Sequence, residues 1–365
     1  MPAIRKLAPA DGAEATRLVE LPTPRPARGE VVIKVLATAL CGTDRHIYHW
    51  DPSIRHSVSP PRTYGHEFCG EVAEAGPGVE LELGSYVSAE MHVVCGRCRP
   101  CRLGQRHVCE NTRILGLHDE GAFAGYVKVP ASNVVRLDRS IVPPRVGAFL
   151  DALGNAVHTT QYAELEGARV AVFGYGPIGA MAAAVAHHAG AERIDIVDVN
   201  PHAIARAEAW KKAKQAAHVH VADAMHRPDW AREVARETEG GVDVVLEMSG
   251  AEAAVNQALK LVRPGGQVSL LGLPRSDSLT LSQYARDLIF KGVSVQAVIG
   301  RRMFDTWERM LELLRTGLDV SFIVSETYPS LEHFHKGMEA FDSGEAQKVV
   351  YFPHGFPGDG GLAKE

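Results

Sequence analysis

The cysteines of this chain are concentrated in one short segment. Four of its six cysteines lie between residues 95 and 109, in the segment CGRCRPCRLGQRHVC. Four thiolates saturate a tetrahedral zinc ion and leave no open coordination position for a substrate. The spacing therefore predicts a structural zinc site. Its ligands would be Cys95, Cys98, Cys101 and Cys109.

Two alternatives to a zinc site remain open for this segment. An iron–sulfur cluster also uses closely spaced cysteines, but here seven residues separate the third cysteine from the fourth, where the bacterial cluster motif has three. A zinc ribbon that binds nucleic acid is the second alternative, because four arginines lie between the cysteines. A formal net charge of -5 and a pI of about 6.4 weaken it. We expect these arginines on a solvated surface.

A second set of metal-binding side chains comes from two other segments. ALCGTDRHIYHWD, residues 39 to 51, contains Cys41, and YGHEFCGEV, residues 64 to 72, contains His66 and Glu67. One thiolate, one imidazole and one carboxylate leave a position of a tetrahedral zinc open, and such a zinc can accept an alcohol oxygen. These residues therefore predict a catalytic zinc.

A glycine-rich turn follows a predicted strand and opens a predicted helix. Glycines at such a turn let the backbone approach a pyrophosphate at the helix N-terminus. Asp198 ends the next predicted strand, nineteen residues after the last glycine, where a carboxylate can bind both ribose hydroxyls and would repel the extra phosphate of NADP. We therefore predict NAD; the alternative is a glycine turn and a helix-capping aspartate. The turn comprises Gly174, Gly176, Pro177, Ile178 and Gly179.

The segments from residue 168 onward predict the first of two domains that position these groups. From residue 168 onward, six apolar strand-like runs alternate with five helical ones, which predicts a parallel, doubly wound α/β sheet. Residues 170 to 191 carry no Asp, Glu, Lys or Arg, but Gly and Pro interrupt them. This predicts strand, turn and buried helix in place of a membrane span.

The remaining segments predict a second, mostly β domain. Before residue 150, short strands are separated by Gly and Pro turns, and the C-terminal tail adds a strand and a helix. We expect a catalytic domain formed by residues 1–152 and 301–365, with a structural-zinc loop at 92–112. Residues 153–300 would form the dinucleotide-binding domain. A chain of 365 residues is long enough for two domains.

Composition predicts a cytoplasmic protein without disulfides. The N-terminus has no apolar run of the kind found in signal peptides. A content of 45% hydrophobic and 23% charged residues lets a chain of this length bury a core without disulfides. Clustered thiols in a reducing compartment more often bind metal. The acidic balance predicts no nucleic-acid or membrane partner.

Together, these motifs resemble the zinc-dependent medium-chain alcohol and polyol dehydrogenases, from GEVVIKVLATALCGTD to AQKVVYF. The resemblance implies a GroES-like mixed β catalytic domain joined to a Rossmann domain with a six-stranded parallel sheet. It implies one catalytic and one structural zinc per subunit, NAD, a small-molecule substrate and a homotetramer. Four longer stretches resemble the branch that oxidises L-threonine at its secondary hydroxyl: CGTDRHIYHWD, GNAVHT, EMSGAEAAVNQAL and GRRMFDTW.

The resemblance also implies roles for individual residues at the catalytic zinc. Asp151 occupies the position of an acidic residue that can complete or exchange at that zinc. In the family a Pro-Phe pair usually follows this acid, whereas this chain has Ala152 and Leu153, so direct ligation by Asp151 is an open question. The other three zinc positions match Cys41, His66 and Glu67.

Three further residues have implied roles and simpler alternatives. Thr43 and His46 match a relay that carries the alcohol proton through the cofactor ribose to water. Alternatively, Thr43 caps the following helix and His46 is a surface histidine. His92 matches a histidine close to the substrate pocket, although it could be a simple loop residue. Arg301 and Arg302 could meet a substrate carboxylate or a neighbouring subunit, but we expect them to be exposed.

Two other functions are open at this stage. A polyol or 2,3-butanediol dehydrogenase would use the same zinc and NAD, and the sequence does not identify partners for the amino and carboxylate groups of an amino acid. A non-catalytic descendant of the fold would have lost a zinc ligand or a relay residue. All of these residues are present in the chain, which favours an enzyme.

Overall fold

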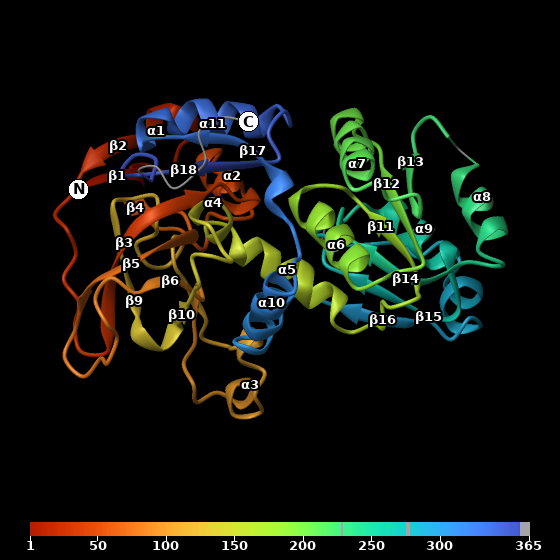
Figure 1. The fold of residues 1–365 in the computed structure, drawn as a ribbon, viewed down its shortest axis with the longest axis horizontal. Coiled ribbons are helices and arrows are strands. Elements are labelled where there is room, and N and C mark those ends of the chain that lie inside the picture. Colours follow the sequence, from red (N-terminus) through yellow and green to blue (C-terminus); the bar gives the residue numbers. More distant parts are fainter. Residues whose placement is uncertain (228, 275–277, 358–365) are drawn as a thin grey trace. The chain divides into compact units, whose positions relative to one another are not determined.

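The computed structural model describes residues 1–227, 229–274 and 278–357, and it consists of two compact units (Figure 1). Unit 1 combines Met1–Ala152 with the C-terminal segment that begins at Val324, and unit 2 is Leu153–Ile323. The α/β fold class with one mixed and one six-stranded parallel sheet is confirmed.

The second crossover between the units lies later than the residue 301 expected from the sequence. Helix α10 (Asp305–Arg315) and the loop after it are bonded to unit 2. Thr306 Oγ1 donates to Gln161 Oε1 at 3.2 Å, and Lys214 Nζ lies 2.9 Å from Asp319 Oδ2. The chain therefore leaves unit 2 only after this helix.

Unit 1 is built on a seven-stranded sheet whose centre is β3 (Glu30–Ala39). This strand reads VVIKVLATA and is buried along most of its length, as expected for a strand covered on both faces. β18 pairs antiparallel with β3, with Val350 opposite Ala39, so the C-terminal tail completes the sheet begun by the N-terminal segment. The other strands are β5 (Glu67–Ala75), β6 (Tyr86–Ala89), β9 (Tyr126–Pro130), β10 (Val134–Arg136), β17 (Val324–Tyr328) and β18 (Lys348–Tyr351).

Smaller elements surround this sheet and carry the site residues. Two short sheets are formed by β1 (Pro2–Lys6), β2 (Thr16–Glu20) and β4 (Arg62–Thr63), and by β7 (His92–Val93) and β8 (Arg113–Ile114). Packed rings of Tyr64, Phe123 and Phe334 lie 5.2 to 5.8 Å apart in the core. The helices are α1 (Gly12–Ala15), α2 (Gly42–Tyr48), α3 (Arg99–Arg102), α4 (Pro144–Gly147) and α11 (Phe334–Asp342). Helix α5 (Leu150–Thr160) begins in unit 1, and its residues from Leu153 onward belong to unit 2.

Unit 2 contains a six-stranded parallel sheet in the order β13-β12-β11-β14-β15-β16 (Figure 1). From β11 the chain adds β12 and β13 on one side. It then crosses back to add β14, β15 and β16 on the other side of β11. In such sheets, ligands bind at the carboxyl ends of the strands where the order reverses. The strands are β11 (Arg169–Phe173), β12 (Arg193–Asp198), β13 (Val219–Asp223), β14 (Val242–Glu247), β15 (Val262–Leu270) and β16 (Ser294–Ala297).

All six predicted strands are present in unit 2, and four of the five helices between them are α-helices. The fifth is a single turn of π-helix, Tyr284–Ile289. The apolar segment 170–191 forms β11, the glycine turn and α6, and none of the helices described in the structure is long and apolar enough to span a membrane. The α-helices are α6 (Pro177–His188), α7 (Pro201–Ala213), α8 (Trp230–Glu237) and α9 (Glu252–Leu261).

Candidate metal centres and cofactor site

Strand pairing in unit 1 brings the three predicted catalytic ligands together. Cys41 lies two residues after the end of β3, and Glu67 opens β5 opposite Ala39 of β3. One ligand atom from each of Cys41, His66 and Glu67 lies within 4.8 Å of the others. His66 and Glu67 are buried, whereas Cys41 is partly exposed. A small molecule could therefore reach the group from the Cys41 side.

The charges around this group fit a bound cation. Asp44 Oδ1 lies 3.7 Å from His66 Nδ1. Burial lowers the pKa of His66, but the negative charges of Asp44 and Cys41 more than offset burial and raise that pKa to about 10. Glu67 Oε1 is buried and has no hydrogen-bond partner among the described residues. A metal ion would satisfy this oxygen and take the place of the imidazole proton.

Asp151 lies near this group but outside the set of three. It sits in the first turn of α5 and is 5% exposed. Burial is the largest influence on the pKa values of His66 and Glu67, and the charge of Asp151 is a smaller one, so the three groups are within electrostatic range. Ala152 and Leu153, which replace the expected Pro-Phe pair, are both buried.

Helix α2 connects the metal group with the solvent. Cys41 is its N-cap residue, and the Cys41 backbone N–H donates to Asp44 Oδ2 at 2.9 Å, so Thr43 is not the cap. Thr43 Oγ1 lies 3.9 Å from Cys41 Sγ. His46 follows one turn later with its side chain 48% exposed, and its Nδ1 lies 3.4 Å from Asp51 Oδ2. A hydroxyl beside the metal group and a histidine at the surface thus share one helix face.

A buried lysine, which the sequence analysis missed, completes the group. Lys348 Nζ donates to Glu67 Oε2 at 2.6 Å and to Leu40 O at 2.9 Å, and both charged side chains are almost fully buried. Burial by itself lowers the pKa of Lys348, but the Glu67 carboxylate more than offsets burial and raises it. Glu67 therefore has one oxygen held by an ammonium group and one available to a metal. The sequence feature that could have identified Lys348 is the position of a charged lysine in the otherwise apolar run KVVYF.

The four clustered cysteines converge in the way that a closed zinc site requires. Their ligand atoms lie within 4.8 Å of one another, with Sγ–Sγ distances of 3.5 Å for Cys95–Cys109 and 3.7 Å for Cys98–Cys109. Zn–S bonds of about 2.3 Å in a tetrahedron place sulfurs about 3.8 Å apart. Backbone hydrogen bonds from Arg97 and Cys98 lower the pKa of Cys95 to about 6, which favours the thiolate.

Loss of the four-cysteine zinc site is expected to destabilise the 95–109 loop locally and to leave unit 2 unaffected. The substitution Cys98→Ser should lower the zinc content from two ions to one per chain and speed trypsin cleavage after Arg97, Arg102 and Arg106 at least about tenfold, because a loop without its metal opens locally. Timed proteolysis with mass spectrometry and metal analysis would measure both. Unchanged resistance of the 95–109 loop to trypsin would contradict a structural role.

The glycine turn has the local geometry of a dinucleotide-binding loop. Gly174 has φ +90°, and a Cβ on Gly179 would overlap the carbonyl oxygen of Gly174, so both positions need glycine. A Cβ on Gly176 would meet open space. Pro177 and Ile178 open α6, and no side chain of the described residues caps its N-terminus. The N–H groups of the first turn are therefore available to a pyrophosphate.

Asp198 is held rigidly beside this turn. Its Oδ2 accepts the backbone N–H of Tyr175 at 2.6 Å, and its Oδ1 accepts those of Val199 and Asn200 at 2.7 and 2.8 Å. These bonds tie the end of β12 to the glycine turn and fix the carboxylate in one orientation. The sequence predicted the position of Asp198 but not this backbone clamp.

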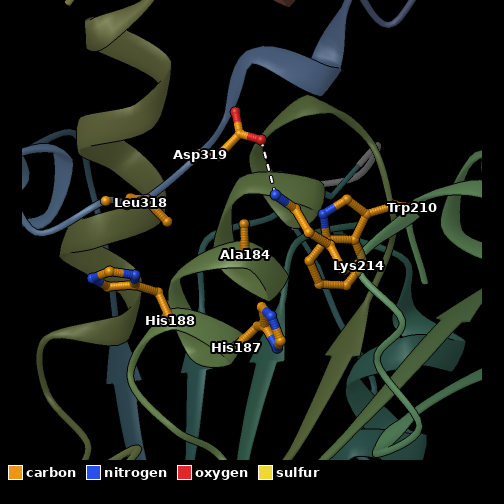
Figure 2. Close-up of a pocket in the computed structure, with 8 residues that line it drawn as sticks. Ala184, His187, His188, Trp210, Lys214, Leu318 and Asp319 are labelled. Carbon is orange, nitrogen blue, oxygen red and sulfur yellow. Dashed lines mark hydrogen bonds and ion pairs between the residues drawn. The ribbon is translucent and has the colours of Figure 1, made fainter. Parts of the chain in front are cut away.

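A cavity in unit 2 is a separate feature (Figure 2). It measures about 150 Å³ and lies at the far end of α6 from the glycine turn, about 16 Å along the helix. Lys214 and Asp319 form an ion pair across it at 2.9 Å. No predicted site residue lines it, so it is not part of the sites above. Its lining includes Ala184, His187, His188, Trp210, Lys214 and Leu318.

Known proteins with the same organisation match nearly the whole chain. Residues 27–139 match the alcohol dehydrogenase GroES-like domain, and residues 177–316 match the zinc-binding dehydrogenase domain. An L-threonine 3-dehydrogenase from Caldanaerobacter subterraneus subsp. tengcongensis is 42% identical over 93% of this chain and 96% of that relative. A second, from Pyrococcus abyssi, is 42% identical over 96% of this chain and 98% of that relative.

A solved structure supports the same family assignment. The alcohol dehydrogenase TADH from Thermus sp. ATN1 superposes with a TM-score of 0.83 at 31% sequence identity, covering 97% of this chain and all of that one. Its full coverage includes both units of the present fold. With its two matched domains, its cysteine cluster and its open Cys-His-Glu group, this chain belongs to the zinc-dependent medium-chain dehydrogenases.

Proposed function

We propose that the protein oxidises the secondary hydroxyl of L-threonine with NAD, which yields 2-amino-3-oxobutanoate. The observation that carries this proposal is the 42% identity to curated L-threonine 3-dehydrogenases over at least 96% of their length. The open Cys41, His66 and Glu67 group supports an alcohol as the reacting group, because it leaves a coordination position free.

Unit 1 contributes the residues that would hold the metal and move the proton. When bound, zinc at Cys41, His66 and Glu67 lowers the pKa of the alcohol, and NAD accepts the hydride. Thr43, beside Cys41, accepts the alcohol proton while it passes its own hydroxyl proton on through the cofactor ribose, and the half-exposed His46 delivers a proton to water. Burial raises the pKa of Glu67, the charge of Lys348 opposes this rise, and the hydrogen bond from Lys348 orients the carboxylate. We assign Asp151 as the fourth residue at this site, an acidic group that can exchange at the metal.

The cofactor contacts come from unit 2. The backbone of the turn from Gly174 to Gly179 binds the pyrophosphate at the N-terminus of α6, with Gly176, Pro177 and Ile178 lining its path. The Asp198 carboxylate accepts hydrogen bonds from the ribose hydroxyls, held in place by three backbone N–H groups.

The clamped carboxylate leads to a prediction about cofactor choice. Asp198→Asn is expected to raise the ratio of kcat/KM with NADP to that with NAD about 10- to 100-fold, because the substitution removes a charge that repels the 2′-phosphate. Asp223→Asn is the matched control, since Asp223 lies opposite Asp198 at the end of β13. Steady-state kinetics with both cofactors measure the ratio, and an unchanged ratio in Asp198→Asn would refute the assignment.

A substrate panel tests the proposed function directly. NADH formation is followed with L-threonine, D-threonine, L-serine, sorbitol and 2,3-butanediol, each with NAD and with NADP. Turnover selective for L-threonine with NAD supports the proposal. Turnover of a diol with none of L-threonine would assign the protein to a polyol or 2,3-butanediol dehydrogenase, and inactivity of the zinc-loaded protein on every substrate would indicate a non-catalytic relative.

We further propose a cytoplasmic homotetramer that has a catalytic domain at residues 1–152 and 324–365 and a dinucleotide-binding domain between them. Unpaired cysteines support a reducing compartment. The edge strand β16 and its flanks expose Val295, Ile299 and Phe290, with Phe290 82% exposed. Such apolar exposure at a sheet edge is typical of a subunit contact. Light scattering in solution would measure the subunit number.

A further inference from the structure

Glu247 is a fully buried carboxylate at the end of β14 that the reaction described above does not use. Its Oε1 accepts the backbone N–H groups of Ser249 at 2.8 Å and of Gly250 at 3.0 Å, and it also accepts the Ser249 hydroxyl at 2.5 Å. Burial raises the pKa of Glu247, and these hydrogen bonds oppose the rise. The carboxylate therefore holds the 248–250 loop in one conformation.

The 248–250 loop lies against the glycine turn. Glu247 is opposite Phe173 in the parallel pair of β14 and β11, and the backbone N–H of Met248 donates to Phe173 O at 2.9 Å. A Cβ on Gly174 would lie only 3.2 Å from the Cβ of Ser249. Ser249 thus backs the first glycine of the turn, and the conformation of the loop limits where that glycine can lie.

The loop that follows β15 packs against the same 248–250 loop. A Cβ on Gly250, which has φ +69°, would overlap the carbonyl oxygen of Leu273, and a Cβ on Gly272 would overlap the backbone N of Gly250. These contacts are between backbones, which cannot yield as a flexible side chain can. The loops after β11, β14 and β15 therefore form one continuous surface at the carboxyl end of the sheet.

This surface lies on the side of the glycine turn opposite Asp198. The order of the strands places β12, which ends in Asp198, on one side of β11 and places β14 on the other. A dinucleotide with one ribose at Asp198 and its pyrophosphate at the turn after β11 extends its other half toward the end of β14. Glu247 lies buried at that end of β14.

We propose that Glu247 is a positioning residue that holds the 248–250 loop as the surface for the nicotinamide half of NAD. Its hydrogen bonds do at β14 what those of Asp198 do at β12. Without them, the loop would be in place in only a fraction of the molecules, and the apparent affinity for NAD would fall by that fraction. The inference rests on the proposed function for the identity of the cofactor.

The test compares NAD with AMP, which has an adenosine and one phosphate but no nicotinamide half. Isothermal titration calorimetry of the zinc-loaded protein gives both dissociation constants, and urea unfolding gives the stability. Glu247→Leu removes the hydrogen bonds with a side chain of similar size, whereas Glu247→Gln keeps one acceptor oxygen. Asp243→Leu is the matched control, because Asp243 lies near the start of the same strand and also accepts a backbone N–H, that of Arg169 at 2.8 Å.

The dissociation constant for NAD should rise about 10- to 100-fold in Glu247→Leu, whereas that for AMP should change less than about threefold. Glu247→Gln should restore most of the lost affinity, because its amide oxygen can still accept from Ser249 and Gly250. Asp243→Leu should lower the stability but bind NAD within about threefold of the unsubstituted protein, since Asp243 is far along β14 from the glycine turn.

Three results would overturn the inference: unchanged NAD binding by Glu247→Leu, equal weakening of NAD and AMP, or an equal loss of NAD affinity in Asp243→Leu. Where Glu247→Leu does not fold, Ser249→Ala decides, because it removes only the hydroxyl. A weaker affinity confined to NAD in that variant supports the inference, and an unchanged one overturns it. None of these measurements needs turnover, so a protein that binds NAD without oxidising L-threonine would refute the proposed function alone.

Discussion

Replacing Cys41 with serine is expected to lower kcat/KM for L-threonine by about 10³- to 10⁵-fold. A serine hydroxyl is a poor zinc ligand compared with a thiolate. The metal contributes several kcal/mol of charge stabilisation, and each 1.4 kcal/mol or so is tenfold in rate. The zinc content should fall from two ions to one per chain, because the separate four-cysteine site is untouched. Steady-state kinetics and metal analysis measure both quantities.

Cys69 provides the matched control for this experiment. It is a buried cysteine outside both metal groups, and burial raises the pKa of its thiol to about 12. Its thiol donates to Pro144 O and accepts a hydrogen bond from the Tyr86 hydroxyl. Cys69→Ser should keep both zinc ions and lose less than about tenfold in activity. A Cys41→Ser protein that keeps both zinc ions and most of its activity would rule out the assignment of Cys41.

The second large effect is expected in stability. Lys348→Met should lower the free energy of unfolding of the zinc-free protein by about 3 to 5 kcal/mol, because it leaves the buried Glu67 carboxylate without its ammonium partner. The loss should be smaller in the zinc-loaded protein, since the metal supplies a second positive charge to Glu67. Urea unfolding of both forms measures the difference.

Lys128→Met serves as the control for lysine removal in the same sheet. Lys128 forms an ion pair with Glu30 at 2.9 Å, but its side chain is 39% exposed. Water screens such a pair, so this substitution should cost less than about 1 kcal/mol. Equal losses of unfolding free energy in the two variants would show that Lys348 does not stabilise the buried Glu67 carboxylate. The orientation of Glu67 would then need another explanation.

The local motifs could be predicted from the amino-acid sequence alone. The four cysteines lie within one short loop, and the glycine turn is six residues long, so their geometry follows from neighbouring residues and glycine conformations. The six strands of unit 2 were recognisable because their apolar runs are each bounded by turns. The Cys41, His66 and Glu67 group was predicted from its ligand types, and the resemblance to known dehydrogenases matched the same three positions.

The contacts between distant segments became known only from the folded chain. Lys348 and Glu67 are 281 residues apart in the sequence and meet because β18 pairs with β3. The order of strands in a sheet cannot be inferred from the local alternation of apolar and polar residues. Arg301, expected at the surface, is fully buried, and a Cβ on Gly154 would overlap it, whereas Arg302 is exposed as expected. The late return of the chain after Ile323 likewise follows from where α10 packs. Burial and partnering of a charged side chain depend on which strands and helices become neighbours, and only the tertiary fold fixes that.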